Sequence, residues 1–208
     1  MTSPFDAASP GRSTPTSTPA TIVGVDPGLS GALFFIDPNH PLTGEAVDIP
    51  THVLTRGGKK KREIDVVQLI HVLALRRITH AFVEQVGAMP GQGVSSTFAF
   101  GKGYGVILGV LAARSIPLSL IPPVRWKREM RVLKDKDGAR ARASQLLPDA
   151  ADQWPRVHHH GRAEAALLAL YGARQLQGSA AVPADLFILS VPAAVKNLSE
   201  YEAAREKV

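Results

Sequence analysis

Short apolar runs, separated by turn residues, dominate the first half of the chain. Two of them flank Pro27-Gly28-Leu29-Ser30-Gly31 and predict a β-hairpin over residues 23 to 36. Further runs predict strands at 81–86 and at 116–121, the latter stopped by Pro122-Pro123, and a weaker strand at 45–49.

Apolar positions at helical spacing alternate with these strands. They predict a helix over 65–77, a long helix from Ser95 or Ser96 as N-cap to Arg114, and a last core helix over 160–175. Two short helices are expected at 124–130 and 138–147. A hairpin followed by crossover helices and further strands indicates an α/β fold, with a mixed sheet and helices on both faces.

The long helix carries small residues at every fourth position. Gly101, Gly105, Gly109 and Ala113 form one stripe along it, and each interior glycine costs about 0.5–1 kcal/mol relative to alanine. Close packing against another part of the same chain would offset that cost, and so would an interface with a second copy. The sequence leaves both possibilities open.

The two ends differ from the middle of the chain. Residues 1–20 are rich in Ser, Thr and Pro and should form a disordered extension, whereas residues 178–208 should form a loosely attached tail with strand-like character only at 185–191. Residues 21–177 should be one folded domain. Within it, the basic segment 56–62 should be a flexible loop, which serves equally well as a solvated linker or as a nucleic-acid contact.

Composition narrows the class of protein. The 208 residues carry a formal net charge of +6 and no cysteine, so disulfides and thiolate zinc sites are excluded. A basic surplus favours a polyanionic partner. The N-terminus lacks the apolar core of a Sec signal, and the apolar stretch at 106–121 is too short to span a bilayer. We therefore expect a cytoplasmic protein without a membrane partner.

Four side chains suit a divalent-metal centre. Asp26 and Glu84 end apolar runs, and His160 and Glu164 lie four residues apart on one helix face. A buried strand that ends in an unpaired carboxylate is energetically unfavourable, and a metal would remove that cost. Two strand carboxylates with a helix-borne pair would suit Mg²⁺, which takes few protein ligands.

The ordered series of motifs resembles the RuvC-type Holliday junction resolvases of the ribonuclease H-like superfamily. It is most similar to the phage and bacterial branch that also resembles the chloroplast junction resolvase. The matching segments are Gly24-Val25-Asp26-Pro27-Gly28-Leu29-Ser30-Gly31, Val83-Glu84-Gln85, Ala88-Met89-Pro90-Gly91-Gln92-Gly93-Val94-Ser95-Ser96, Phe100-Gly101-Lys102-Gly103-Tyr104-Gly105, Pro123-Val124-Arg125-Trp126-Lys127, Lys136 with Arg140, and His160-Gly161-Arg162-Ala163-Glu164-Ala165.

The resemblance implies a ribonuclease H-like nuclease domain over residues 21–177 that binds two Mg²⁺ ions, or Mn²⁺ in their place. It also implies a homodimer that cuts four-way DNA junctions. Asp26 corresponds to the ligand on the first strand, Glu84 to the second ligand and Glu164 to the helix carboxylate. His160 stands where the branch more usually has Asp. A neutral imidazole there could ligate the metal or accept a proton from water.

Several residues are expected to contact DNA. Bacterial RuvC proteins are expected to place an aromatic wedge after the second ligand, but Gly87 occupies that place here, and Met89 is the nearest large apolar group. Met89 serves equally well in simple loop packing. The candidate phosphate contacts are Lys102, Arg125, Lys127, Lys136, Arg140 and Arg162.

Two other functions compete with a junction-resolving endonuclease. The His160 replacement makes a catalytically weak or inactive junction-binding protein credible. The first hairpin alone would also suit a sugar-kinase-type ATPase, but that fold predicts a second glycine-rich phosphate loop, which the sequence lacks.

Overall fold

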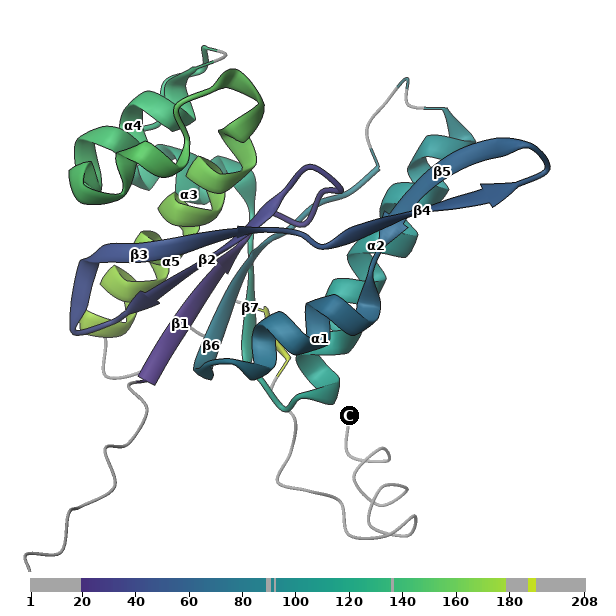
Figure 1. Ribbon diagram of the computed structural model, residues 1–208. Coiled ribbons are helices and arrows are strands. Elements are labelled where there is room, and N and C mark those ends of the chain that lie inside the picture. The colour runs from purple at the N-terminus through teal and green to yellow at the C-terminus, as the bar shows by residue number, and fades with distance from the viewer. Residues whose placement is uncertain (1–19, 89–90, 92, 136, 179–186, 190–208) are drawn as a thin grey trace, which may run out of the picture.

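A six-stranded sheet with helices on both faces forms the body of the protein (Figure 1). The computed structural model describes residues 20–88, 91, 93–135, 137–178 and 187–189. The strands are β1 (Ala20–Val25), β2 (Ala32–Asp37), β3 (His40–Asp48), β4 (Thr51–Arg56), β5 (Lys59–Ile64), β6 (Arg77–Glu84), β7 (Leu118–Ile121) and β8 (Phe187–Leu189). The helices are α1 (Val66–Ala74), α2 (Val94–Ala113), α3 (Pro123–Glu129), α4 (Gly138–Leu146), the 3₁₀ turns η1 (Pro148–Gln153) and η2 (Val157–His159), and α5 (His160–Gly178).

The sheet is mixed, which confirms the predicted fold class. Its order is β3-β2-β1-β6-β7-β8, with β1, β2 and β3 antiparallel, β6 and β7 parallel to β1, and β8 antiparallel to β7. Side chains alternate between the two faces of a strand. In β1, Ile22 packs into the core beneath α5, whereas Val23 and Val25 pack into the core beneath α1 and α2.

A backbone contact sets the position of α5 on the sheet. A Cβ atom added at Gly24 would lie 2.1 Å from the Ala165 carbonyl oxygen and 2.4 Å from the Ala169 nitrogen. No side chain fits between β1 and α5 there. The glycine therefore lets the helix lie directly on the strand that leads to Asp26.

The basic segment 56–62 is not a loop, contrary to expectation. Its residues form the turn and one strand of the hairpin β4–β5, paired from Thr51 with Ile64 to Arg56 with Lys59. Gly57 and Gly58 have φ of 55° and 73°, as a two-residue hairpin turn with positive φ at both positions requires. The Gly57-Gly58 pair is the sequence signal for this turn. It is easily overlooked, because a run of charged residues is typical of a loop.

Other element bounds differ from expectation by a few residues. The third strand is longer than predicted, from His40 to Asp48, and α5 continues to Gly178. The N-cap of α2 is Gly93, without a side-chain hydrogen bond, rather than Ser95 or Ser96. The N-terminal extension and most of the predicted tail lie outside the described residues, although β8 pairs with β7.

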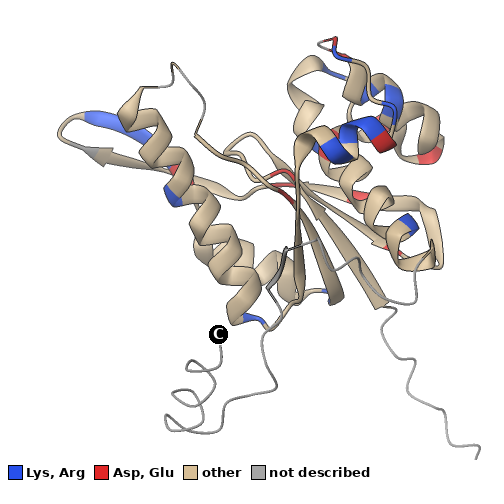
Figure 2. Ribbon diagram, turned by 180° about the vertical axis from the view of Figure 1, so that it is seen from behind, with Lys and Arg blue, Asp and Glu red and all other residues tan. Residues whose placement is uncertain are grey.

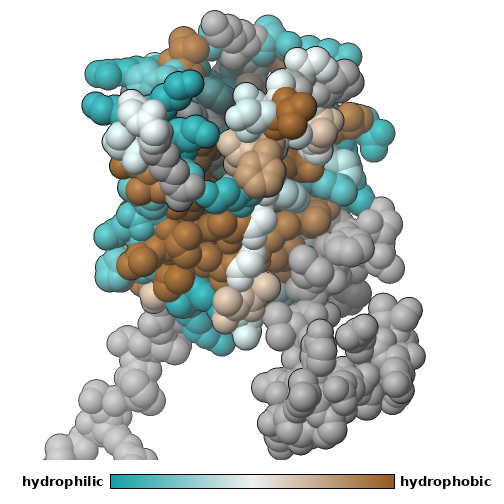
Figure 3. Space-filling model, turned by 90° about the vertical axis from the view of Figure 1, so that its right-hand side faces the viewer, coloured by the Kyte–Doolittle hydropathy of each residue, from teal (hydrophilic) through white to brown (hydrophobic). Residues whose placement is uncertain are grey.

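The glycine stripe of α2 faces outward. Outside the neighbouring turns of α2, Cβ atoms added at Gly101, Gly105 or Gly109 would lie within 4 Å of no atom in the described part of the chain. Packing within the described part of the chain therefore does not explain this stripe. Figure 3 shows a broad apolar surface on this side of the molecule, and Val94 and Phe98 of α2 are 87% and 74% exposed.

By length and apolar composition alone, α2 could cross a membrane. One such helix is weak evidence, because core helices of soluble proteins share those properties. Ile107, Val110 and Leu111 of α2 are buried in the core beside the sheet.

Candidate metal centre

Three carboxylates meet at one end of the sheet. The pairing of β1 with β6 sets Val25 beside Val83, so Asp26 and Glu84, the next residues, lie side by side at the ends of adjacent parallel strands. Glu164 reaches them from the first turns of α5. One oxygen from each of these three residues lies within 4.8 Å of the other two. The structure thus brings together three of the four predicted ligands.

The start of α5 lies directly against the turn that follows β1. A Cβ atom added at Gly161 would lie 2.7 Å from the Ser30 carbonyl oxygen and 2.8 Å from Asp26 Oδ2. Together with the Gly24 contact, this approach holds the helix against the strand at two points. Glu164 is therefore fixed relative to Asp26 by backbone packing as well as by its rotamer.

The carboxylates resist being charged at the same time. Burial and the nearby charges of Glu164 and Glu84 raise the pKa of Asp26 to about 7. Burial and Glu164 also raise the pKa of Glu84. Three hard oxygen donors that repel one another suit a divalent cation, which would relieve the repulsion. The donor set therefore fits Mg²⁺ or Mn²⁺.

Two further residues belong to this site, and sequence reasoning missed their roles. The Trp126 indole Nε1 donates a hydrogen bond to Glu84 Oε1 at 3.1 Å, and Trp126 is fully buried. Lys127 Nζ lies 2.8 Å from Glu164 Oε1 and 3.9 Å from Glu84 Oε1. Although burial lowers the pKa of Lys127, the hydrogen bond and charge of Glu164 raise it overall. Lys127, expected to contact phosphate, thus lies among the carboxylates.

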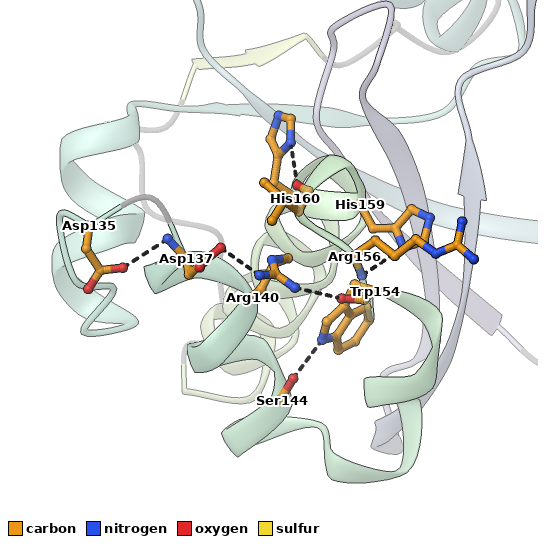
Figure 4. A network of polar contacts seen from close by, with 9 residues as sticks. Asp135, Asp137, Arg140, Ser144, Trp154, Arg156, His159 and His160 are labelled. Atoms are coloured by element: carbon orange, nitrogen blue, oxygen red, sulfur yellow. Dashed lines mark hydrogen bonds and ion pairs between the residues drawn. The ribbon is translucent and has the colours of Figure 1, made fainter.

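His160 lies next to the cluster of three carboxylates but does not belong to it. It begins α5, and its Nδ1 lies 3.3 Å from the Val157 carbonyl oxygen (Figure 4). Its side chain lines a hollow of about 500 Å³ together with Lys127 and Glu164. The predicted role of His160 as ligand or base therefore stays a prediction.

Five of the expected DNA contacts lie on helices: Lys102 on α2, Arg125 and Lys127 on α3, Arg140 on α4 and Arg162 on α5. Figure 2 shows where Lys and Arg lie relative to the Asp and Glu at the strand ends. Several are engaged within the chain. Arg162 donates two hydrogen bonds of 2.6 Å to Asp48, Arg140 binds Asp137 at 2.6 Å, and Lys102 binds Glu63 at 2.5 Å. Arg125 lies 3.4 Å from Glu129, and Met89 and Lys136 lie outside the described residues. These assignments stay predictions.

Arg140 also helps to hold the region beneath the site together. Its second guanidinium nitrogen contacts the Trp154 carbonyl oxygen at 3.5 Å, and the Trp154 indole donates to Ser144 Oγ at 2.9 Å (Figure 4). Arg140 therefore connects α4 with the segment that leads into α5, whatever else it binds.

The mixed sheet with helices on both faces is a ribonuclease H-like α/β fold, similar to that of solved RuvC structures. Similar solved structures include "T. thermophilus RuvC in complex with Holliday junction substrate", with a TM-score of 0.52 and 17% identity over 78% of this chain and 99% of that one. A second is "Thermus thermophilus RuvC structure", with a TM-score of 0.47 and 16% identity over 76% of this chain and 96% of that one. At these identities the likeness shows the fold alone. The sequence matches no known family profile and no curated protein.

Asp26→Asn should stabilise the metal-free protein in a pH-dependent way. The raised pKa means that the folded state holds this proton more tightly than the unfolded chain, so wild-type stability declines as pH rises from about 4 to about 7. Asn imitates the protonated acid. We expect urea denaturation in EDTA at pH 8 to show a free energy of unfolding that is about 1–3 kcal/mol higher for the variant. A pKa shift of one unit corresponds to about 1.4 kcal/mol. The gain should shrink steadily at pH 5 and pH 4.

Mg²⁺ or Mn²⁺ should raise the melting temperature of the wild type at pH 8 but not that of Asp26→Asn, because bound metal stabilises only the folded state. An equal metal response in both proteins would contradict a site at Asp26.

Trp126→Phe should weaken metal binding by about tenfold, because groups that orient metal ligands typically contribute that much. Trp154→Phe is the matched control: both indoles are buried in the same core and donate one hydrogen bond, but Trp154 donates to Ser144 and not to a carboxylate. Mn²⁺ titration by calorimetry measures both. Equal affinity of the two variants would mean that Trp126 only fills the core.

Proposed function

We propose that this protein is a structure-selective endodeoxyribonuclease that resolves four-way DNA junctions by metal-dependent hydrolysis of phosphodiesters. The observation that carries the proposal is the carboxylate group of Asp26, Glu84 and Glu164 at the strand ends of a RuvC-like sheet. The solved structure with this fold that contains a Holliday junction supports branched DNA as the substrate. Such a reaction would take place in the cytoplasm.

The carboxylates would hold two Mg²⁺ ions, with Mn²⁺ able to substitute. Bound there, the ions would supply a water nucleophile and stabilise the attacking and leaving oxygens. The chain itself orients the ligands. Trp126 fixes one oxygen of Glu84, and the backbone contacts at Gly24 and Gly161 hold Glu164 against Asp26.

Lys127 supports both this proposal and an alternative. Its ammonium group balances part of the acidic charge and lies where a substrate phosphate would meet the carboxylates. The same ion pair, with His160 outside the carboxylate group, favours a second candidate, a junction-binding protein with weak or no catalysis. A cleavage assay separates the two candidates.

Basic side chains around the site would bind the arms of the junction. Phosphate contacts from Arg125, Lys127, Lys136, Arg140 and Arg162 would give affinity and salt dependence rather than sequence choice. Arg162 and Arg140 would have to share their donors with Asp48 and Asp137.

A homodimer follows from the symmetry of the substrate. Two opposed strands require two active sites, and a two-fold interface places them symmetrically. The outward glycine stripe of α2, at Gly101, Gly105 and Gly109, supports this part of the helix as the interface.

Wild-type protein with Mg²⁺ should nick opposed strands of a synthetic four-way junction and leave a linear duplex of the same sequence intact. Asp26→Asn and Glu84→Gln should each lower the rate at least about a hundredfold, yet bind the junction as wild type does, because neither change touches the basic surface. Denaturing gels and fluorescence anisotropy measure both properties. Junction binding without metal-dependent nicking by the wild type would establish the second candidate.

His160→Ala should lose most of the cleavage activity, whereas His158→Ala, two residues earlier, should change it little. His160→Asp supplies the carboxylate that the resemblance expects and should retain activity. Single-turnover rates on the same junction make the comparison. Wild-type rates for His160→Ala would reduce the site to its three carboxylates.

Gly105→Leu should disrupt the dimer, because a bulky side chain would occupy the space where two copies of α2 approach. Gly105→Ala is the control, since an added Cβ lies within 4 Å of no other described residue outside the neighbouring turns of α2, and it should weaken the dimer much less than leucine does. Light scattering gives the mass of each variant. A wild type that is monomeric while making paired nicks would contradict the interface.

A further inference from the structure

A hollow of about 300 Å³ lies between the hairpin β4–β5 and the first half of α2. Figure 1 shows the hairpin extending away from the sheet beside this helix. The lining combines apolar and cationic side chains: Leu29, Ile64, Val66, Phe98 and Val106 with Lys61, Arg62 and Lys102. Phe98 keeps 74% of its surface exposed. A large bare phenyl group is thus held beside a cluster of cations.

The hairpin is attached to the turn that carries the metal centre. The Arg62 guanidinium donates to the Leu29 carbonyl oxygen and lies 3.4 Å from Ser30 Oγ. Both residues belong to the turn between Asp26 and β2. The position of the hairpin is therefore coupled to the position of the first metal-ligand candidate.

This hollow is one of three neighbouring hollows that share lining residues, and the first of them is lined by Glu164. Glu164 and His160 line one hollow. His160 also lines a second hollow of about 480 Å³, which lies next to the turn after Asp26 and the start of α5. The second hollow in turn shares Leu29 and Arg62 with the hairpin hollow. The hairpin hollow is therefore linked to the carboxylates through a series of adjacent lining residues.

The apolar and cationic side chains that line this hollow suit a single nucleotide whose base is unpaired. A phenyl face stacks on any base, and such stacking contributes about 1–3 kcal/mol per base. The Glu63 carboxylate balances Lys102, with which it pairs at 2.5 Å, so Lys61 and Arg62 supply the positive charge for a phosphate.

We propose that this hairpin hollow binds one unpaired nucleotide of the branched DNA, with the base on Phe98 and the phosphate at Lys61 and Arg62. The inference rests on the proposed function and adds a reason for selecting branched DNA. A base pair at a branch point lacks one stacking neighbour, so one of its bases leaves the stack at a lower free-energy cost than a base in a continuous duplex.

Phe98→Ala should lower affinity for a four-way junction about five- to thirtyfold and leave affinity for a linear duplex unchanged. Phe98→Trp should keep the wild-type affinity. Val94→Ala is the matched control, because Val94 lies one turn earlier on α2 and is 87% exposed, but does not line the hollow. Anisotropy titrations in the Glu84→Gln background separate binding from cleavage.

The charged half of the hollow is tested in the same way. Lys61→Gln should weaken junction binding and reduce its salt dependence, whereas Lys60→Gln, which removes the same charge from the neighbouring position outside the lining, should have a smaller effect.

A short single-stranded oligonucleotide with 2-aminopurine provides a test that does not depend on junction cleavage. Its fluorescence should be quenched by wild-type protein and not by Phe98→Ala. Quenching that depends on Phe98, in a protein that never cleaves junctions, would retain the hollow and reject the proposed function. If Phe98→Ala cleaves and binds the junction as the wild type does, the proposed function is retained and the nucleotide site in the hollow is rejected. Loss of the dimer in Phe98→Ala, with equal loss of duplex binding, would assign Phe98 to the interface between copies and overturn the inference.

Discussion

The direct contact of α5 with β1 is the constraint on which the rest of the site depends. At Gly24 and Gly161, one chain segment lies so close to another that even a single Cβ atom would collide with backbone or with Asp26 itself. These two contacts fix the depth and angle at which α5 crosses the sheet. A shift of the helix by the width of a methyl group would move Glu164 away from Asp26 and Glu84, whose oxygens it now approaches within 4.8 Å.

That close packing creates an electrostatic conflict. Three carboxylates share a partly buried position, and the pKa of Asp26 is raised to about 7 first by its burial and then by the charges of Glu164 and Glu84. In the metal-free protein, Lys127 and the Trp126 indole offset part of this conflict. A protein selected for stability alone would not keep such a group, because burying unbalanced charge is unfavourable. The arrangement is reasonable when a dication completes the balance, so the conflict itself argues for metal binding.

Sequence patterns were sufficient for the sheet, most helices and the carboxylates, because each of these depends on local regularities. Strand ends at Asp26 and Glu84 follow from apolar runs, and helical spacing places Glu164 on the last core helix. Contacts between distant segments were not readable in this way. Trp126 was quoted only as part of a motif, although it donates to Glu84, which lies 42 residues earlier. The hairpin β4–β5 was missed because lysines at exposed strand positions resemble a solvated loop, and only Gly57-Gly58 indicates a turn. The outward direction of the α2 glycines depends on where the sheet lies, which spacing alone does not determine.

The missed hairpin changes how the basic charge of the chain relates to its acidic centre. Taken as a loop, the segment would carry charge without a fixed direction. As a strand tied through Arg62 to the turn that follows Asp26, it holds its lysines at a fixed place relative to the carboxylates. On the other side, α3 brings Lys127 directly into the carboxylate group. Cations thus approach the three carboxylates from two elements that flank them, one attached to the turn that follows Asp26 and the other paired with Glu164. A phosphate backbone bound by both would lie across the carboxylates, because the same backbone contacts that assemble the metal ligands also position the groups that would hold the DNA.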